Sequence, residues 1–255
     1  MNALKTPSAP ALERGLRALE LLARSRTGLT LAELTRQLQI PKSTAHCVLL
    51  TLERCGYLHR NERNRYLFGL KLFSVANMAL SGLELRERAA PFLKSLMART
   101  RLTAHLAVLE QNEAVLIDKV EPIGVLKLAT WLGKRMDVHC TGLGKALAAY
   151  LPEDELEALV HERGLPRHND NTISSLKRLK DDLARVRKLG YSLDDEEDEV
   201  GARCVGAPVF GPEDKVIAAV SVSGTVLQIV PENVGAIAER VKECAASIGA
   251  VLQPV

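Results

Sequence analysis

The first 68 residues carry helix and turn signals whose order restricts the fold more than any other feature. Apolar residues at helical spacing predict a helix over residues 11–24. Thr30 and Glu33 have the spacing of a capping box and predict the start of a short second helix. Pro41 suits the first turn of a third helix, and residues 57–68 have the pattern strand, polar turn, strand. This order is that of a winged helix-turn-helix.

The third helix is expected to bury one face and to present polar side chains on the other. Its predicted inward residues recur at helical offsets: Ala45, Val48, Leu49 and Leu52. An exposed first turn with hydroxyl and basic side chains is suited to phosphates and base edges in a DNA major groove. The candidate DNA contacts are therefore Lys42, Ser43, Thr44, His46 and Cys47 on this helix, with Arg63 and Arg65 on the hairpin.

The charge distribution supports a polyanion partner for this region. Residues 1–80 contain 12 Lys and Arg against 5 Asp and Glu, a net charge of +7, whereas the remainder carries −4. A basic module joined to an acidic one is typical of nucleic-acid binding, although chance clustering of solvated charges is the alternative. A purely architectural DNA-binding protein is a further alternative, but the long second part of the chain argues against it.

Length and composition indicate a globular chain of two domains. The 255 residues are 47% apolar and 25% charged, which excludes a disordered chain and a disulfide-stapled miniprotein. No apolar signal segment or membrane-length apolar run is present, so we expect a cytoplasmic protein with no membrane partner. The expected parts are a flexible tail (1–10), the winged helix-turn-helix (11–68), linker and dimerisation helices (69–100), and a C-terminal domain (101–255).

The linker is expected to pair with a second copy of the chain. Residues 69–80 are apolar around much of the helix circumference, and such a helix needs a partner surface. Residues 83–100 resume helical spacing, with Pro91 predicting a kink or restart. Packing on their own domain is the alternative, but a symmetric dimer suits a palindromic DNA site.

The C-terminal part predicts an α+β domain with one sheet. Its expected strands cover 104–109, 114–120, 125–129, 204–210 and 216–223, and its expected helices cover 173–189 and 231–252. Thr141 and two glycines precede a further helix, whose start offers free N–H groups to a small anion. Ser221 and Ser223 share one face of their strand and form either the floor of a pocket or ordinary hydroxyl contacts.

Three segments together resemble the IclR family of bacterial transcriptional regulators. They are residues 133–146, residues 190–224 and the recognition-helix segment Pro41–His46, within a resemblance that spans residues 11–252. It implies a winged helix-turn-helix joined by a linker helix to a GAF-like effector-binding domain with a mostly antiparallel central sheet. It also implies a homodimer or dimer of dimers and a DNA-binding regulator, a repressor rather than an activator, that responds to a small effector.

The same resemblance implies an effector site for a small carboxylate. The backbone of Gly142 and Leu143 would meet the carboxylate, and Asp194, Cys204, Ser221 and Ser223 would line the rest. One departure concerns the DNA-facing helix, because the family commonly has Arg where this chain has Cys47. In the acidic run 194–199, the resemblance turns only Asp194 inward, and the rest is expected to be a solvated loop.

A cysteine-dependent enzyme or a metal-binding protein is the alternative reading of the C-terminal part. His139 and Cys140 are neighbours on an extended chain and point to opposite faces, so the histidine is poorly placed to activate the thiol. A zinc site from His139, Cys140 and Cys204 lacks closely spaced ligand pairs. The five cysteines also form no C-x-x-C pair. We therefore expect no catalytic residue, no metal site and no cofactor.

Overall fold

The computed structural model describes residues 9–81, 84–123 and 129–252 and divides the chain into two compact units, Met1–Gly82 and Leu83–Val255. The division falls inside the stretch expected to be the linker. Of the strand expected over residues 125–129, all but the last residue lies outside the described residues. Most of the expected flexible tail, residues 1–8, also lies outside them.

The first unit is a winged helix-turn-helix, as expected. Its helices and strands are α1 (Pro10–Ala23), β1 (Leu29–Thr30), α2 (Leu31–Leu38), α3 (Lys42–Arg54), β2 (Leu58–Arg60), β3 (Arg65–Phe68) and α4 (Leu70–Ser81). The strands form an antiparallel sheet in the order β1-β3-β2, in which the sequence reading had missed the short β1. The core is an apolar cluster whose buried members are Ala18, Leu22, Leu29, Leu34, Leu38, Leu49, Leu58 and Tyr66.

Local chemistry explains where two helices of this unit begin. The Thr30 hydroxyl accepts a hydrogen bond from the Glu33 amide (3.2 Å), and Glu33 accepts one from the Thr30 amide (2.7 Å), which completes the predicted capping box of α2. Pro41 is the residue before α3 rather than part of its first turn. Gly28, just before β1, has a φ of 74°, and a Cβ atom there would lie 2.4 Å from the Tyr66 carbonyl oxygen.

Helix α4 exposes large apolar side chains. Leu70 is 85% exposed, Phe73 69% and Met78 77%. These side chains lie outside the apolar core clusters formed by the described residues. The expected apolar character of this helix is confirmed. In a single chain it leaves an apolar face exposed to solvent, which is unfavourable.

The second unit is built on a six-stranded antiparallel sheet in the order β6-β5-β4-β9-β8-β7. The strands are β4 (Thr103–Glu110), β5 (Glu113–Val120), β6 (Arg135–Met136), β7 (Ser192–Asp195), β8 (Ala202–Phe210) and β9 (Val216–Thr225). The helices are α5 (Glu84–Thr100), α6 (Gly142–Ala148), α7 (Glu153–Arg163), α8 (Leu176–Leu189), α9 (Pro231–Leu252) and a 3₁₀ turn, η1 (Pro212–Asp214).

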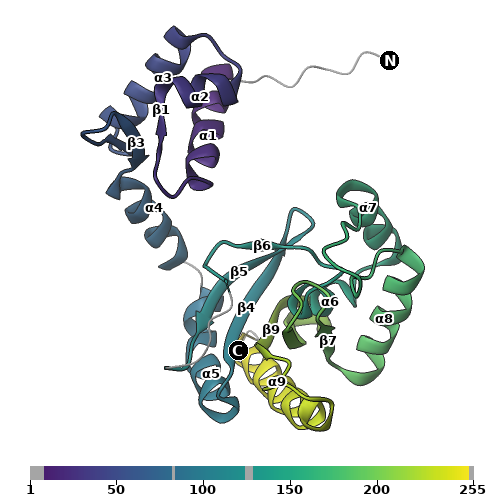
Figure 1. Ribbon diagram of the computed structural model, residues 1–255. Helices are drawn as coiled ribbons and strands as arrows, with labels where there is room; N and C mark the ends of the chain where they lie inside the picture. Colours follow the sequence, from purple (N-terminus) through teal and green to yellow (C-terminus); the bar gives the residue numbers. More distant parts are fainter. Residues whose placement is uncertain (1–8, 82–83, 124–128, 253–255) are drawn as a thin grey trace. The chain divides into compact units, whose positions relative to one another are not determined.

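Helices cover both faces of this sheet (Figure 1). α5 and α9 pack on one face, where Val220 and Val222 of β9 enter the main core. The short α6 packs on the other face, and α7 and α8 form a second apolar cluster beside it. Helix α9 has the predicted bounds, α8 begins three residues later than expected, and α7 was not predicted. Pro91 lies inside α5 without ending it.

The described residues contain no helix that is both long and apolar enough to cross a membrane.

Candidate functional site

The start of α3 presents the expected polar side chains. Lys42, Ser43, His46 and Cys47 are exposed, and Thr44 is partly exposed. The helix has no side-chain cap and no acidic residue in its first turn. Its first backbone N–H groups, which have no partner within the helix, are therefore open to a phosphate. Ala45 and Leu49 are buried on the opposite face, whereas Val48 and Leu52 are only partly buried.

The structure distinguishes the two arginines that the sequence predicts as wing contacts. Arg63 is exposed at the β2–β3 turn, where its backbone amide donates to the Asn61 side chain. The Arg65 guanidinium donates to the Gly28 carbonyl (3.0 and 3.1 Å) and forms an ion pair with Glu33 (3.1 Å). Arg65 therefore ties the wing to the start of α2, while Arg63 is free of such contacts among the described residues.

The six predicted effector residues line one cavity in the second unit. Its walls come from the start of α6, from β7, β8 and β9, and from the segment before β6, and they include Gly142, Leu143, Asp194, Cys204, Ser221 and Ser223. The space available to the centres of water-sized molecules is about 50 Å³. At roughly 10–15 Å³ for each water, this space holds a molecule of a few non-hydrogen atoms.

The register of the antiparallel sheet explains why these side chains meet. Asp194 pairs with Cys204, and Cys204 pairs with Ser223, so the three form one row across β7, β8 and β9. Ser221 lies in the next row, where it pairs with His105 of β4. Because residues two apart on a strand share a face, the predicted orientation of both serines toward one side is confirmed.

Two glycines allow α6 to begin directly on the sheet. A Cβ atom on Gly206 of β8 would lie 2.5 Å from the Gly142 carbonyl oxygen, and one on Gly142 would lie 3.2 Å from the Cβ of Cys204. The Ser192 hydroxyl donates to the same Gly142 carbonyl at 2.6 Å. These contacts fix the first turn of α6 at the cavity wall, with Thr141 as its cap through the Gly144 amide (3.0 Å).

The polar side chains of the cavity are only partly paired. The Ser223 hydroxyl donates to Cys204 Sγ (3.0 Å) and lies 3.4 Å from His105 Nδ1. Burial lowers the pKa of His105 to about 4, so this ring is neutral at physiological pH. Ser221 is a buried residue on the cavity wall, and its hydroxyl makes no hydrogen bond to another described residue. A hydroxyl that faces the cavity without a protein partner is available to a ligand or water.

Asp194 is the ionisable group at the cavity whose charge is most sensitive to its surroundings. Its pKa is raised to about 7, chiefly by burial; a hydrogen bond from the Glu197 amide (2.8 Å) opposes the rise, and the Glu197 carboxylate adds to it. At neutral pH the carboxyl group is therefore divided between its protonated and ionised forms. A protonated Asp194 can donate a hydrogen bond to an anion, which the ionised form cannot.

Three features of this region escaped the sequence reading. His105 lies in a predicted strand between Ala104 and Leu106, which enter the main core. That alternation is the signal that could have placed His105 on the opposite, cavity face. Lys134, which also lines the cavity, supplies a cation and lies in one of the resemblance segments. The expectation that only Asp194 turns inward from the acidic run is wrong, because Glu197 is buried against the fully buried Lys145 (2.6 Å).

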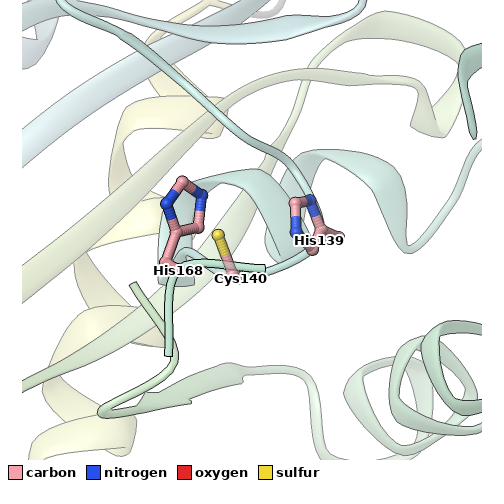
Figure 2. A group of neighbouring side chains, drawn as sticks. All are labelled: His139, Cys140 and His168. Atoms are coloured by element: carbon pink, nitrogen blue, oxygen red, sulfur yellow. The ribbon is translucent and has the colours of Figure 1, made fainter. Parts of the chain in front are cut away.

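The structure matches neither the cysteine-dependent enzyme nor the zinc site of His139, Cys140 and Cys204 that the sequence raised as alternatives. Cys204 lines the cavity, whereas His139 and Cys140 lie beside His168, from the loop between α7 and α8 (Figure 2). Burial raises the pKa of the Cys140 thiol well above its usual range, so in the structure as it stands it is no nucleophile. The His139 ring is held by the Pro166 carbonyl (3.0 Å).

The two units define a class of protein in which a winged helix-turn-helix precedes a domain with a polar cavity on an antiparallel sheet. Residues 11–62 match the IclR helix-turn-helix domain, and residues 77–250 match the domain described as bacterial transcriptional regulator IclR C-terminal. The chain belongs to the IclR family and is a DNA-binding transcriptional regulator.

Individual relatives agree with this assignment along most of the chain. The transcriptional repressor IclR of Escherichia coli K12 is 35% identical over 90% of this chain and 85% of its own. The regulator XynR of the same strain is 36% identical over 85% of this chain and 86% of its own. A crystal structure of an IclR homologue from Microbacterium hydrocarbonoxydans with 4-hydroxybenzoate is similar with a TM-score of 0.82 and 28% identity, covering 95% of this chain and 98% of that one.

Proposed function

We propose that this regulator is a repressor that binds its operator as a dimer. Its affinity for the operator changes when a small carboxylate occupies the cavity. The observation that carries the effector half is the gathering of all six expected residues at one cavity. The name of the E. coli relative supports repression. The homologue that holds 4-hydroxybenzoate supports an organic-acid effector.

The cavity favours a carboxylate for three reasons. The amide groups of Gly142 and Leu143 belong to a first helical turn and have no acceptor within α6. Ser221 offers an unpaired hydroxyl, and Asp194 can supply a proton. Lys134 adds a positive charge at the wall. The small free volume favours an aliphatic acid of a few atoms over an aromatic acid.

The DNA half of the proposal rests on the exposed start of α3 and on the wing. Lys42, Ser43 and Thr44 would contact phosphates and base edges in a major groove, with His46 and Cys47 one turn further along. Arg63 would contact the backbone beside it. For Arg65, the contacts to Gly28 and Glu33 support a role in holding the wing in place while its partly exposed guanidinium faces DNA.

Dimerisation would join two such readers through α4. Its exposed Leu70, Phe73 and Met78 suit burial against the same helix of a second copy, which is the isologous contact that a palindromic operator requires. The effector would act by binding one arrangement of the dimer more tightly than another, because a ligand shifts an equilibrium only by that difference.

Calorimetry with acetate, pyruvate and 4-hydroxybenzoate tests the effector half on the full chain. We expect one of the two aliphatic acids to bind wild type and the double variant S221A/C204A to bind at least ten times more weakly. The matched control, S247A/C55A, changes the same residue types away from the cavity, at a partly exposed serine and an exposed cysteine, and should bind as wild type. Unchanged binding in S221A/C204A would place the effector elsewhere.

Gel shifts with duplexes selected from a random-sequence pool test the DNA half. The S43A/T44A variant should bind the selected duplex at least ten times more weakly, because two donors to the DNA are lost. S247A is the control. Equal affinity of S43A/T44A and wild type would remove α3 from the interface.

A further inference from the structure

His139, Cys140 and His168 form a cluster that the regulator function does not use. One candidate ligand atom from each side chain lies within 4.8 Å of the others, which is the one such grouping of three His, Cys, Asp or Glu residues found among the described residues. In the view of Figure 2 the Cys140 sulfur projects between the two imidazole rings. We propose that these three side chains form a zinc site, with a solvent molecule as the fourth ligand.

Each ring already has one nitrogen bound to an acceptor outside the cluster. His139 Nε2 lies 3.0 Å from the Pro166 carbonyl oxygen, and His168 Nε2 lies 2.9 Å from Asp137 Oδ2. A carbonyl or a carboxylate only accepts, so each Nε2 carries the proton and each Nδ1 keeps its lone pair in the neutral ring. No described residue forms a hydrogen bond to either Nδ1. A histidine with one nitrogen bound to an outer acceptor and the other free is the usual arrangement in metal sites.

The surrounding charge favours a divalent cation. The Asp137 carboxylate accepts from His168 Nε2 beside the cluster, and the Asp198 carboxylate also acts on Cys140. Zinc binding would form a Zn–thiolate bond and release the thiol proton to solvent, and the two carboxylates would stabilise the added positive charge.

The donor set selects zinc over the other common cations. One thiolate and two imidazoles suit zinc, whereas calcium and magnesium require oxygen ligands. His139 and Cys140 are buried and His168 is exposed, so the open position faces the solvent side of the cluster. The sequence could not find this set, because His168 lies 28 residues after Cys140 and on a different loop.

A bound ion would add a further link between two segments that already meet through the His139–Pro166 and His168–Asp137 contacts. Cys140 immediately precedes Thr141 and Gly142 at the cavity wall, and His168 belongs to the loop between α7 and α8. The proposal does not depend on the effector, and its test uses the metal alone.

Zinc binding to the full-length reduced protein is measured by competition with a chromophoric chelator, and the same site is filled with Co²⁺ for absorption spectroscopy. We expect one tight site for each chain and a thiolate-to-cobalt charge-transfer band. C140S should lose the band, H168A should weaken zinc at least ten-fold, and D137N should weaken it about 10–100-fold.

Matched controls change the same residue types away from the cluster: C55S for the thiol and H161A for the imidazole, both exposed. Circular dichroism confirms that each variant is folded. H168A should disturb the fold least of the cluster variants, because the His168 side chain is exposed. The proposal is overturned if wild type binds no zinc tightly, if the cobalt spectrum lacks the band, or if C55S and H161A lose the metal while C140S and H168A keep it.

Discussion

The ammonium group of Lys145 lies 2.6 Å from Oε1 of Glu197, and neither side chain is more than slightly exposed. Asp182 Oδ2 lies 3.0 Å from the same nitrogen, and the Leu193 carbonyl also accepts from it. One buried cation thus joins α6, α8, β7 and the acidic loop that follows β7. Glu197 in turn donates its backbone amide to Asp194 (2.8 Å), so the same loop contacts the cavity wall.

Replacing Lys145 with Met should destabilise the second unit strongly, because it leaves Glu197 buried without a cation and leaves Asp182 with Arg185 alone. We expect a loss of about 3–5 kcal/mol at neutral pH. Urea unfolding followed by the fluorescence of Trp131, the single tryptophan, measures it. Lys180, which pairs with Glu153 and Glu157 at the surface, is the control, and K180M should change stability far less than K145M. Equal effects of the two substitutions would contradict this account.

Effector affinity should fall as the pH rises above about 7. Asp194, whose pKa burial raises to about 7, must be protonated to donate to an anionic carboxylate. The charged or titratable groups that act on it are Glu197, Lys145 and Asp198, and it in turn acts on the Cys204 thiol. Uptake of one proton predicts roughly a ten-fold loss of affinity for each pH unit above the pKa. Calorimetry in buffers of different ionisation enthalpy should detect that proton, and D194N should bind without uptake.

The same carboxyl group makes the free protein less stable as the pH rises. Its folded pKa of about 7 exceeds the ordinary value of 3.8, so the folded state holds the proton more tightly than the unfolded chain. The contribution of Asp194 to stability is therefore fully present below about pH 4, declines between about pH 4 and 7, and is lost above that range. D194N should match wild type at pH 4 and exceed it by about 1–3 kcal/mol at pH 8. If wild type instead gained stability relative to D194N between pH 4 and pH 8, the raised pKa of Asp194 would be contradicted.

Gly206→Ala should disrupt the cavity wall. Its Cβ would lie 2.5 Å from a backbone oxygen of Gly142, so α6 must shift away from β8. We expect a loss of about 1–3 kcal/mol from the forced backbone movement and weaker effector binding. Gly235 of α9 is the control because a Cβ there meets nothing within 4 Å. G235A should stabilise by about 0.5–1 kcal/mol through helix propensity, as thermal unfolding would show.

The two wing arginines should separate DNA contact from support of the fold. R63A should reduce the slope of log affinity against log salt by about 0.9 and leave stability unchanged. R65A should cost the first unit about 1–2 kcal/mol through the lost contacts to Gly28 and Glu33, which hydrogen exchange of β3 amides would report. A slope change in R65A equal to that in R63A would show that Arg65 also binds phosphate.

Local rules explain most of what could be predicted from the sequence. The capping box at Thr30, the bounds of α9 and the alternation of β9 are set by neighbouring residues, so periodicity and capping rules find them. The gathering of Asp194, Cys204 and Ser223 was expected from the family resemblance rather than from those rules.

Long-range pairing explains what was missed. Glu197 looked like part of a solvated acidic run because its partner, Lys145, is 52 residues away. His168 had no local signal that related it to Cys140. In α7, weak separation of apolar and polar faces left only Leu156 and Leu159 to be buried, and that pattern is too short to predict a helix.

Alternate residues of strand β9 have different surroundings: Val220 and Val222 lie in the main core, and Ser221 and Ser223 line the cavity. Substitution at positions 221 and 223 can therefore change the chemistry of the cavity without changing the side chains of the main core. A one-residue insertion in β9 would turn the serines toward the core and the valines toward the cavity. New ligand preferences on this scaffold are accessible by single point changes along one side of a single strand.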